Sequence, residues 1–389
     1  MIYFPVIQTI AIGFKFALGI LSDGSLFGWG ENKYGQLDIP KVKKEWSEVA
    51  AGSFHSLGLL KDGTILGWGH NKYGQTNIPQ ILPTQYWVSV AARGYYSLGL
   101  LNDGTIKAWG IRNEVVLNVP EKPPQKLFIA ISAGNNYALG LLDDGNIIGW
   151  GLDYNGHDIM IPKLVNDRRY VAISAGGSRI LGLLDNGRVL DWNSDFSQIE
   201  VPSISKNLRF VAISAGLNSY GILNDGSLVT WGSLRNDFLP TKPDDRVWIQ
   251  IVSGEYCSMG LLDDGTLLTW GTRDFCLSEQ ITDLNFYVPP NWSNWIERRR
   301  EQIGNPEEMR EFALQILEMP GGKREKARRA VNNFKTDVDS KSGLCKDLSN
   351  NMYRDELFLL AQELGLSINK NITKKELCDV IAVYGNFDV

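Results

Sequence analysis

Short apolar runs separated by polar turns dominate the first 290 residues of the chain. In the segment 46–79, an aromatic and β-branched run that ends at Gly52 is followed by the apolar runs 56–60 and 64–69. Asp62-Gly63 separates these two runs, and this pair favours positive φ, so that it closes a tight hairpin. A loop and a last extended piece then end in an aliphatic residue followed by proline. The segment therefore predicts three or four short antiparallel strands.

The same pattern recurs seven times along the chain. The turn glycines lie 39 to 42 residues apart, and a tryptophan follows each of them by five residues. The glycines are Gly24, Gly63, Gly104, Gly145, Gly187, Gly226 and Gly265, and the tryptophans are Trp29, Trp68, Trp109, Trp150, Trp192, Trp231 and Trp270. The proline that ends each copy suits the outer edge of a small sheet, because it cannot donate to a ladder. Together the copies predict an all-β, seven-bladed β-propeller over residues 1–290.

The repeated residues are predicted to have structural roles. The tryptophans are expected to pack between blades, and the Asp-Gly acids are expected to form turns rather than a ring of metal-binding carboxylates. A further aliphatic-Pro-like pair, Phe4-Pro5, precedes the first copy. We therefore expect residues near 1–6 to pair with the last blade and close the ring, because an open repeat array leaves apolar faces unburied.

The repeat resembles that of the RCC1 (regulator of chromosome condensation) family, in its bacterial-type form. The resemblance is carried by the segment VAAGSFHSLGLLKDGTILGWGHNKYGQTNIP and, in the first copy, by LSDGSLFGWGENKYGQLDIP. The family's repeated histidine is kept only as His55, and its position is otherwise taken by Phe16, Tyr96, Tyr137, Arg179 and Cys257. Family members that act as exchange factors on a Ran-type GTPase carry a protruding β-wedge. The regular blade spacing leaves no room for that insertion, so the resemblance does not imply exchange activity here.

The pattern changes after residue 290, where the Asp-Gly turns end. Residues 291–389 hold 16 Lys or Arg and 16 Asp or Glu, and their periodicity predicts a small all-α domain. A stretch at 351–385 resembles the helix–loop–helix modules of the SAP and Rho N-terminal type. Two basic clusters are candidate binding sites for phosphate backbones or an acidic protein face: Arg298, Arg299 and Arg300, and Lys323, Arg324, Lys326, Arg328 and Arg329.

Composition argues against most kinds of chemistry. The net charge is −5 and there are only three histidines, none at metal-ligand spacing from a cysteine or an acid. The four cysteines form no CxxC pair, so free thiols in an intracellular protein, cytoplasmic or nuclear, are expected, with Cys257 as a small buried side chain. No stretch is apolar enough to span a membrane. We expect no catalytic residues, no cofactor and no metal.

The sequence is most consistent with a non-enzymatic scaffold that binds one or more proteins. The candidate contacts are the loops that vary most between copies, namely 71–77, 112–118, 153–159 and 235–238, with the tail as a second surface. Two alternatives stay open: a guanine-nucleotide exchange factor for a small GTPase, and a protein that binds nucleic acid or chromatin through its basic tail. The Lys- and Asn-rich tail is also compatible with a viral, virion-associated protein.

Overall fold

The computed structural model describes residues 9–111, 114–164, 168–232, 239–271 and 284–288. The chain divides into two compact units, Met1–Leu317 and Glu318–Val389, and all described residues belong to the first. The tail helices, the stretch at 351–385 and the domain boundary predicted at residue 290 lie outside the described residues.

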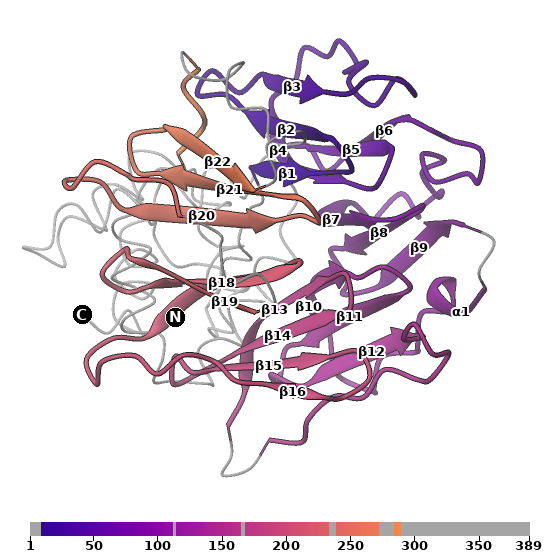
Figure 1. Cartoon of the computed structure of the whole chain (residues 1–389). Coiled ribbons are helices and arrows are strands. Elements are labelled where there is room, and N and C mark those ends of the chain that lie inside the picture. Colours follow the sequence, from indigo (N-terminus) through magenta and orange to yellow (C-terminus); the bar gives the residue numbers. More distant parts are fainter. Residues whose placement is uncertain (1–8, 112–113, 165–167, 233–238, 272–283, 289–389) are drawn as a thin grey trace, which may run out of the picture. The chain divides into compact units, whose positions relative to one another are not determined.

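Seven antiparallel sheets follow one another along the chain, and we call them blades 1 to 7 (Figure 1). Their first strands are β1 (Ile10–Ile12), β4 (Trp46–Ala51), β7 (Trp87–Arg93), β10 (Phe128–Ala133), β13 (Tyr170–Gly176), β17 (Phe210–Ala215) and β20 (Trp248–Ser253). The second strands are β2 (Phe16–Ile20), β5 (His55–Leu60), β8 (Tyr96–Leu101), β11 (Tyr137–Leu142), β14 (Arg179–Leu184), β18 (Asn218–Leu223) and β21 (Cys257–Leu262). The third strands are β3 (Leu26–Gly30), β6 (Ile65–Gly69), β9 (Ile106–Gly110), β12 (Ile147–Gly151), β15 (Val189–Asn193), β19 (Leu228–Gly232) and β22 (Leu267–Gly271). The all-β, propeller-like fold expected from the repeat is thereby confirmed.

Among the described residues a fourth strand forms in blade 5 alone, where β16 (Gln198–Ile199) pairs with β15. In blade 1 the corresponding piece packs instead of pairing, because Leu37 and Ile39 press their side chains against Gly28 of β3. In blade 1 the aliphatic residue before the proline thus covers the outer strand without extending its ladder. The loop after β9 contains a short helix, α1 (Glu114–Leu117), which the sequence pattern did not predict.

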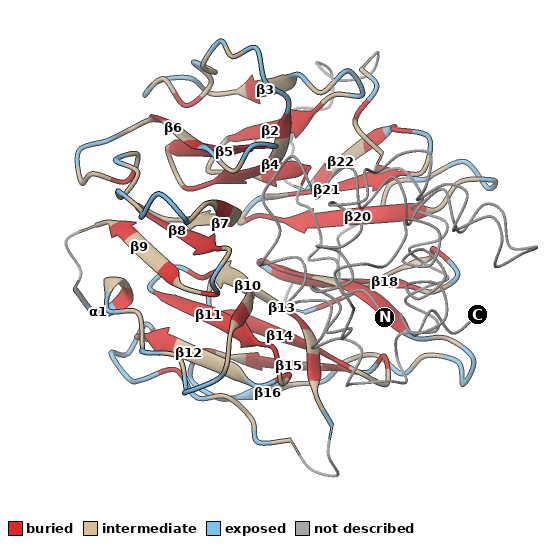
Figure 2. Cartoon of the chain, turned by 180° about the vertical axis from the view of Figure 1, so that it is seen from behind, coloured by how far each residue is buried: buried red, intermediate tan, exposed pale blue. Residues whose placement is uncertain are grey.

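The blades contact one another in circular order. The first strand of each blade contacts the next blade, and β1 contacts both β20 and β21, so the last blade adjoins the first. Each interface encloses its own apolar cluster, and the buried residues concentrate in the strands while the connections are exposed (Figure 2). Stability therefore depends on every blade having a neighbour on both sides.

The segment 284–288 joins blade 7 to blade 1. Phe286 forms an antiparallel bridge with Leu21, and the Tyr287 amide donates to the Ile20 carbonyl at 2.9 Å. The Phe286 ring lies against Gly19 as Trp46 lies against Gly58 in blade 2. The segment thus supplies the start of the first strand that blade 1 otherwise lacks. The closing strand predicted at residues 1–6 lies outside the described residues.

Candidate functional site

The polar side chain of each Asp-Gly or Asn-Gly turn forms a hydrogen bond with the backbone of its own turn. All seven turn glycines have positive φ, between 71° and 87°. In every copy the side chain before the glycine accepts a hydrogen bond from the amide two residues further on, for example Asp62 from Thr64 at 3.1 Å. At Asp23 the hydrogen bonds from the Ser25 side chain and amide lower the carboxyl pKa. These acids are turn formers and lie in separate blades.

The seven tryptophans lie between blades and are not available to a ligand. They are 2 to 8% exposed. In blades 2 to 7 the indole N–H donates to the preceding blade at 2.7 to 3.1 Å, as Trp68 does to the Gln36 carbonyl and Trp109 to the Gln75 carbonyl. In blade 2 the ring also packs on the aromatic residue that starts the first strand, with Trp46 and Trp68 centroids 5.8 Å apart. In these six blades the indole therefore combines apolar burial with one directional bond across the interface.

In blades 2 to 5 the side chain at the start of the second strand also reaches into the next blade. His55 Nε2 lies 2.9 Å from Ser97 Oγ, and the Tyr137 hydroxyl donates to the Arg179 carbonyl at 2.6 Å. Burial lowers the pKa of His55 to about 3, with a further contribution from His70. His55 is therefore neutral and structural at physiological pH.

In blade 5 this position holds a buried arginine. The Arg179 guanidinium donates to Asp191 Oδ2 at 3.0 Å and to Ser219 Oγ at 2.9 Å, and Trp231 Nε1 donates to the same aspartate oxygen at 2.7 Å. Asp191 Oδ2 thus accepts hydrogen bonds that help to offset the burial of the ion pair, although Asp191 Oδ1 is buried without a hydrogen-bond partner. The ion pair joins blades 5 and 6.

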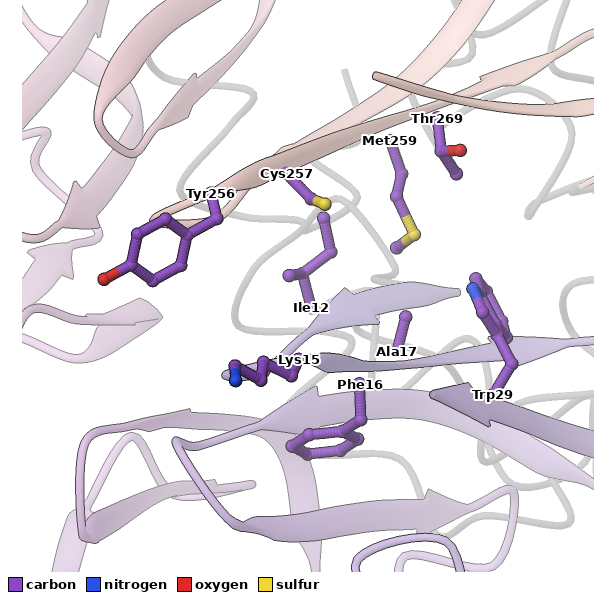
Figure 3. Close-up of a pocket in the computed structure, with 10 residues that line it drawn as sticks. Ile12, Lys15, Phe16, Ala17, Trp29, Tyr256, Cys257, Met259 and Thr269 are labelled. Carbon is purple, nitrogen blue, oxygen red and sulfur yellow. The ribbon is translucent and has the colours of Figure 1, made fainter. Parts of the chain in front are cut away.

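Cys257 differs from its predicted state. It is only half-buried and forms a disulfide bond whose partner lies outside the described residues, so the expectation of a free, buried thiol is wrong at this residue. Its side chain lines a small pocket between blades 7 and 1, together with Ile12, Phe16 and Met259 (Figure 3). The pocket has room for little more than one water molecule. Within the described part of the chain, no three histidines, cysteines or acids come together as metal ligands.

One side of the propeller carries two sets of connections, and we call it the turn face. It holds the turns between first and second strands and the first part of the loop that follows each third strand, because the end of each third strand pairs with the start of the second, as Gly69 pairs with His55. Six of the eight exposed large hydrophobic side chains of the described residues lie in these turns and loops: Tyr34, Val115, Tyr154, Phe196, Leu217 and Tyr256. The opposite side, which carries the Asp-Gly turns, is the hairpin face.

Blades 7, 1, 2 and 3 bring seven aromatic rings together on the turn face. We call this set the aromatic patch: Phe14, Phe54, Tyr95 and Tyr256 from the turns, and Tyr34, His70 and Tyr73 from the loops. Phe54 lies at its centre, with centroids 5.5 Å from Phe14, 5.0 Å from Tyr34 and 5.9 Å from Tyr95. The rings form one continuous surface across four blades.

The two loops of the patch share the sequence Asn-Lys-Tyr-Gly-Gln and one architecture. The buried Gln36 accepts from the Tyr34 amide at 2.8 Å, and the buried Gln75 accepts from the Tyr73 amide at 3.0 Å. Each loop places a lysine over its tyrosine ring, Lys33 at 5.5 Å and Lys72 at 5.7 Å from the centroid. Asn and Gln thus hold the backbone, whereas Lys and Tyr are directed outward.

Some of the residues predicted as binding sites lie on the turn face, and others lie outside the described residues. The loops 71–77 and 153–159 lie on the turn face, and the first contributes Tyr73 to the aromatic patch. Residues 112–113 and the loop 235–238 lie outside the described residues, as do all eight basic residues of the two tail clusters. The patch itself was not predicted, although the aromatic residue that follows the first strand in four copies was visible in the sequence.

Comparisons with known proteins agree with the repeat. Residues 7–36, 46–75 and 128–156 match the model of the regulator of chromosome condensation (RCC1) repeat. The fold is similar to the CRINKLY WD40 ectodomain of the Arabidopsis thaliana receptor kinase ACR4, with a TM-score of 0.55 and 24% identity over 68% of this chain and 95% of that one. It is also similar to the ectodomain of the Physcomitrella patens receptor kinase CR4 (TM-score 0.54, 18% identity, 68% and 73% of the two chains).

A third similar structure is Prp20p from Saccharomyces cerevisiae, described together with its binding to Gsp1p and histones (TM-score 0.50, 16% identity, 75% and 85% of the two chains). Among curated proteins, none matches the sequence significantly. No helix in the described part of the chain is long and apolar enough to cross a membrane. The repeated strands, the turns and the family match agree: three of the repeats in this chain are RCC1 repeats.

Proposed function

We propose that this protein is a non-enzymatic interaction platform that binds a protein partner through its turn face. The observation that supports the proposal is the unequal distribution of exposed apolar side chains between the two faces. Six lie on the turn face, whereas the linkers of the hairpin face expose Leu82. Clustered exposed aromatic residues on a rigid scaffold are typical of protein-binding surfaces.

The rigid framework beneath the turn face favours the same function. The tryptophan and turn positions are used for blade packing and for the hairpins, so the copies of the repeat differ mainly in their connections. Loops held by a constant scaffold are where binding specificity is usually placed. The helical tail predicted from the sequence is proposed as a second contact surface.

The test is a comparison of captured proteins between matched variants. The turn-face variant carries Tyr34→Ala, Tyr73→Ala and Tyr256→Ala, and the control carries Leu82→Ala on the other face. We expect the wild type and the control to retain the same cross-linked partner from the native source, and the turn-face variant to lose it with an unchanged melting temperature. Retention of the same partners by all three proteins would contradict the proposal.

Two assays separate this function from the alternatives. A nucleotide-release assay over a panel of small GTPases should give no acceleration if the protein is a platform rather than an exchange factor. Replacement of the basic tail clusters by alanine in the full chain should leave partner capture by the turn face intact. Loss of salt-dependent DNA binding in that variant would instead favour association with nucleic acid.

A further inference from the structure

The aromatic patch differs in charge from the described loops of blades 4 and 5 on the turn face. Three lysine ammonium groups lie over its rings, at 5.5 to 5.7 Å from the centroids: Lys15 over Phe14, Lys33 over Tyr34 and Lys72 over Tyr73. In blades 4 and 5 the segments 152–159 and 194–200, which follow the third strands, contain no lysine or arginine and expose Asp158 and Asp195. Lysines therefore accompany the rings of the patch, whereas the described loops of blades 4 and 5 carry acids.

Two acids near the patch, Glu255 and Asp38, have partners within the described residues. Glu255 lies 3.7 Å from the Arg93 guanidinium, which spans from blade 3 toward blade 7 and also donates to Asn135 at 3.1 Å. Asp38 accepts from the Asn32 side chain at 2.8 Å within its loop. The exposed ammonium groups of Lys33 and Lys72 have ring contacts within the described residues, and a carboxylate can approach them without displacing these contacts.

The geometry of the rings favours a peptide over nucleic acid bases. Most pairs in the patch meet edge to face, so a ring edge already covers part of a neighbouring ring face, and lysines lie over three of the faces. Base stacking requires open ring faces. Carboxylates beside lysines and aliphatic or aromatic side chains between tilted rings require neither an open face nor a deep pocket.

We infer that the aromatic patch binds an acidic, extended segment of a partner protein, with carboxylates beside Lys33 and Lys72 and apolar side chains packed around Phe54. This inference rests on the proposed function and specifies the chemistry of its partner. The two Asn-Lys-Tyr-Gly-Gln loops then bind successive parts of one segment. The exposed Asp158 and Asp195 of blades 4 and 5 repel the same segment.

The experiment uses the full chain and short labelled peptides, with binding followed by fluorescence anisotropy. The first peptide combines Asp and Glu with Leu and Phe, the second replaces its acids by lysine, and the third is polyglutamate. An oligothymidylate is the nucleic acid probe. We expect the first peptide to bind best and its affinity to fall as salt rises.

Two pairs of substitutions locate the binding. Lys33→Glu with Lys72→Glu should weaken binding at least about tenfold, whereas Lys41→Glu with Lys43→Glu makes the same charge change at exposed sites on the hairpin face and should leave it unchanged. Tyr34→Ala with Tyr73→Ala should also weaken binding of the peptide. Tyr154→Ala should not, because this ring, which is 69% exposed, lies outside the patch in the loop after β12.

Three outcomes would overturn the inference: equal binding of acidic and basic peptides, equal binding by patch and control variants, or competition by oligothymidylate at the patch. None of them refutes the platform itself, because capture of a partner through the turn face is measured separately with the triple tyrosine variant. Loss of that capture together with failure of the acidic peptides would mean that the face binds a partner of other chemistry.

Discussion

Replacement of Glu48 by glutamine is expected to stabilise the propeller at neutral and mildly alkaline pH. Glu48 starts the regular part of β4 after a bulge, is 8% exposed, and accepts a hydrogen bond from Ser89 Oγ of blade 3 at 3.0 Å. Burial raises the pKa of its carboxyl from 4.5 to about 8, although the Ser89 bond acts in the opposite direction. Glutamine keeps the shape and the acceptor oxygen without the charge.

The sign of the pH effect follows from proton binding. Between pH 4.5 and 8 the folded chain keeps the Glu48 proton and the unfolded chain releases it, so this group makes the wild type less stable as pH rises. His55 acts in the opposite direction below its unfolded value of 6.5, because the folded state keeps it neutral. The pH range in which Glu48 acts without His55 therefore lies between about pH 6.5 and 8. Across this range the free energy of unfolding of the wild type should fall by about 1.5 to 2 kcal/mol because of Glu48.

The assay is urea and thermal unfolding of the wild type, Glu48→Gln and the control Glu200→Gln at several pH values in this window. A loss of this size lowers the wild-type melting temperature by roughly 3 to 4 °C relative to Glu48→Gln. Glu200 is exposed, and its variant makes the same change of side chain outside the core. Equal pH dependence of the wild type and Glu48→Gln would refute the conclusion that the buried carboxyl is protonated in the folded state.

Three further predictions concern the framework. Phe286→Ala should lower the free energy of unfolding by about 3 to 5 kcal/mol because it empties the contact that joins the last blade to the first, with a smaller loss for Phe286→Leu; urea unfolding that matches the wild type would exclude this closure. Trp109→Phe should cost about 1 to 3 kcal/mol by removing the 2.9 Å bond to the preceding blade, and an unchanged unfolding midpoint would contradict that role. Gly63→Ala should melt at a lower temperature than Gly156→Ala. The two glycines have similar positive φ, 83° and 85°, but only at Gly63 does an added Cβ come within 3 Å of a neighbouring atom. Equal melting temperatures would mean that backbone strain is the whole effect.

The strands and turns of the blades could be predicted because they depend on local sequence. An Asp-Gly pair between two apolar runs specifies a hairpin and its register, whatever lies elsewhere in the chain. Seven such units in register then require a circular array to bury their remaining apolar faces. The fold class therefore followed from periodicity, and the RCC1 resemblance agreed with it.

Contacts between repeats could not be obtained in this way. Phe286 lies more than 260 positions from blade 1 in the sequence (286 − 21 = 265 to its partner Leu21), yet it completes the first strand of that blade, whose own segment Ile10–Ile12 is short. The bonds of His55, Tyr137 and Arg179 depend on atoms about 40 residues away, in the next blade. Such partners become neighbours only when the angle between blades is set by the packing of their interfaces.

The amino-acid order alone determined how many blades form, where each hairpin turns and which indoles are buried, because each of these depends on spacings within one repeat. Tertiary structure alone decided that rings from Phe14 to Tyr256 meet on one surface and that lysines border it. These residues are separated by up to 242 positions (256 − 14). They are adjacent because closure of the ring places the last blade beside the first.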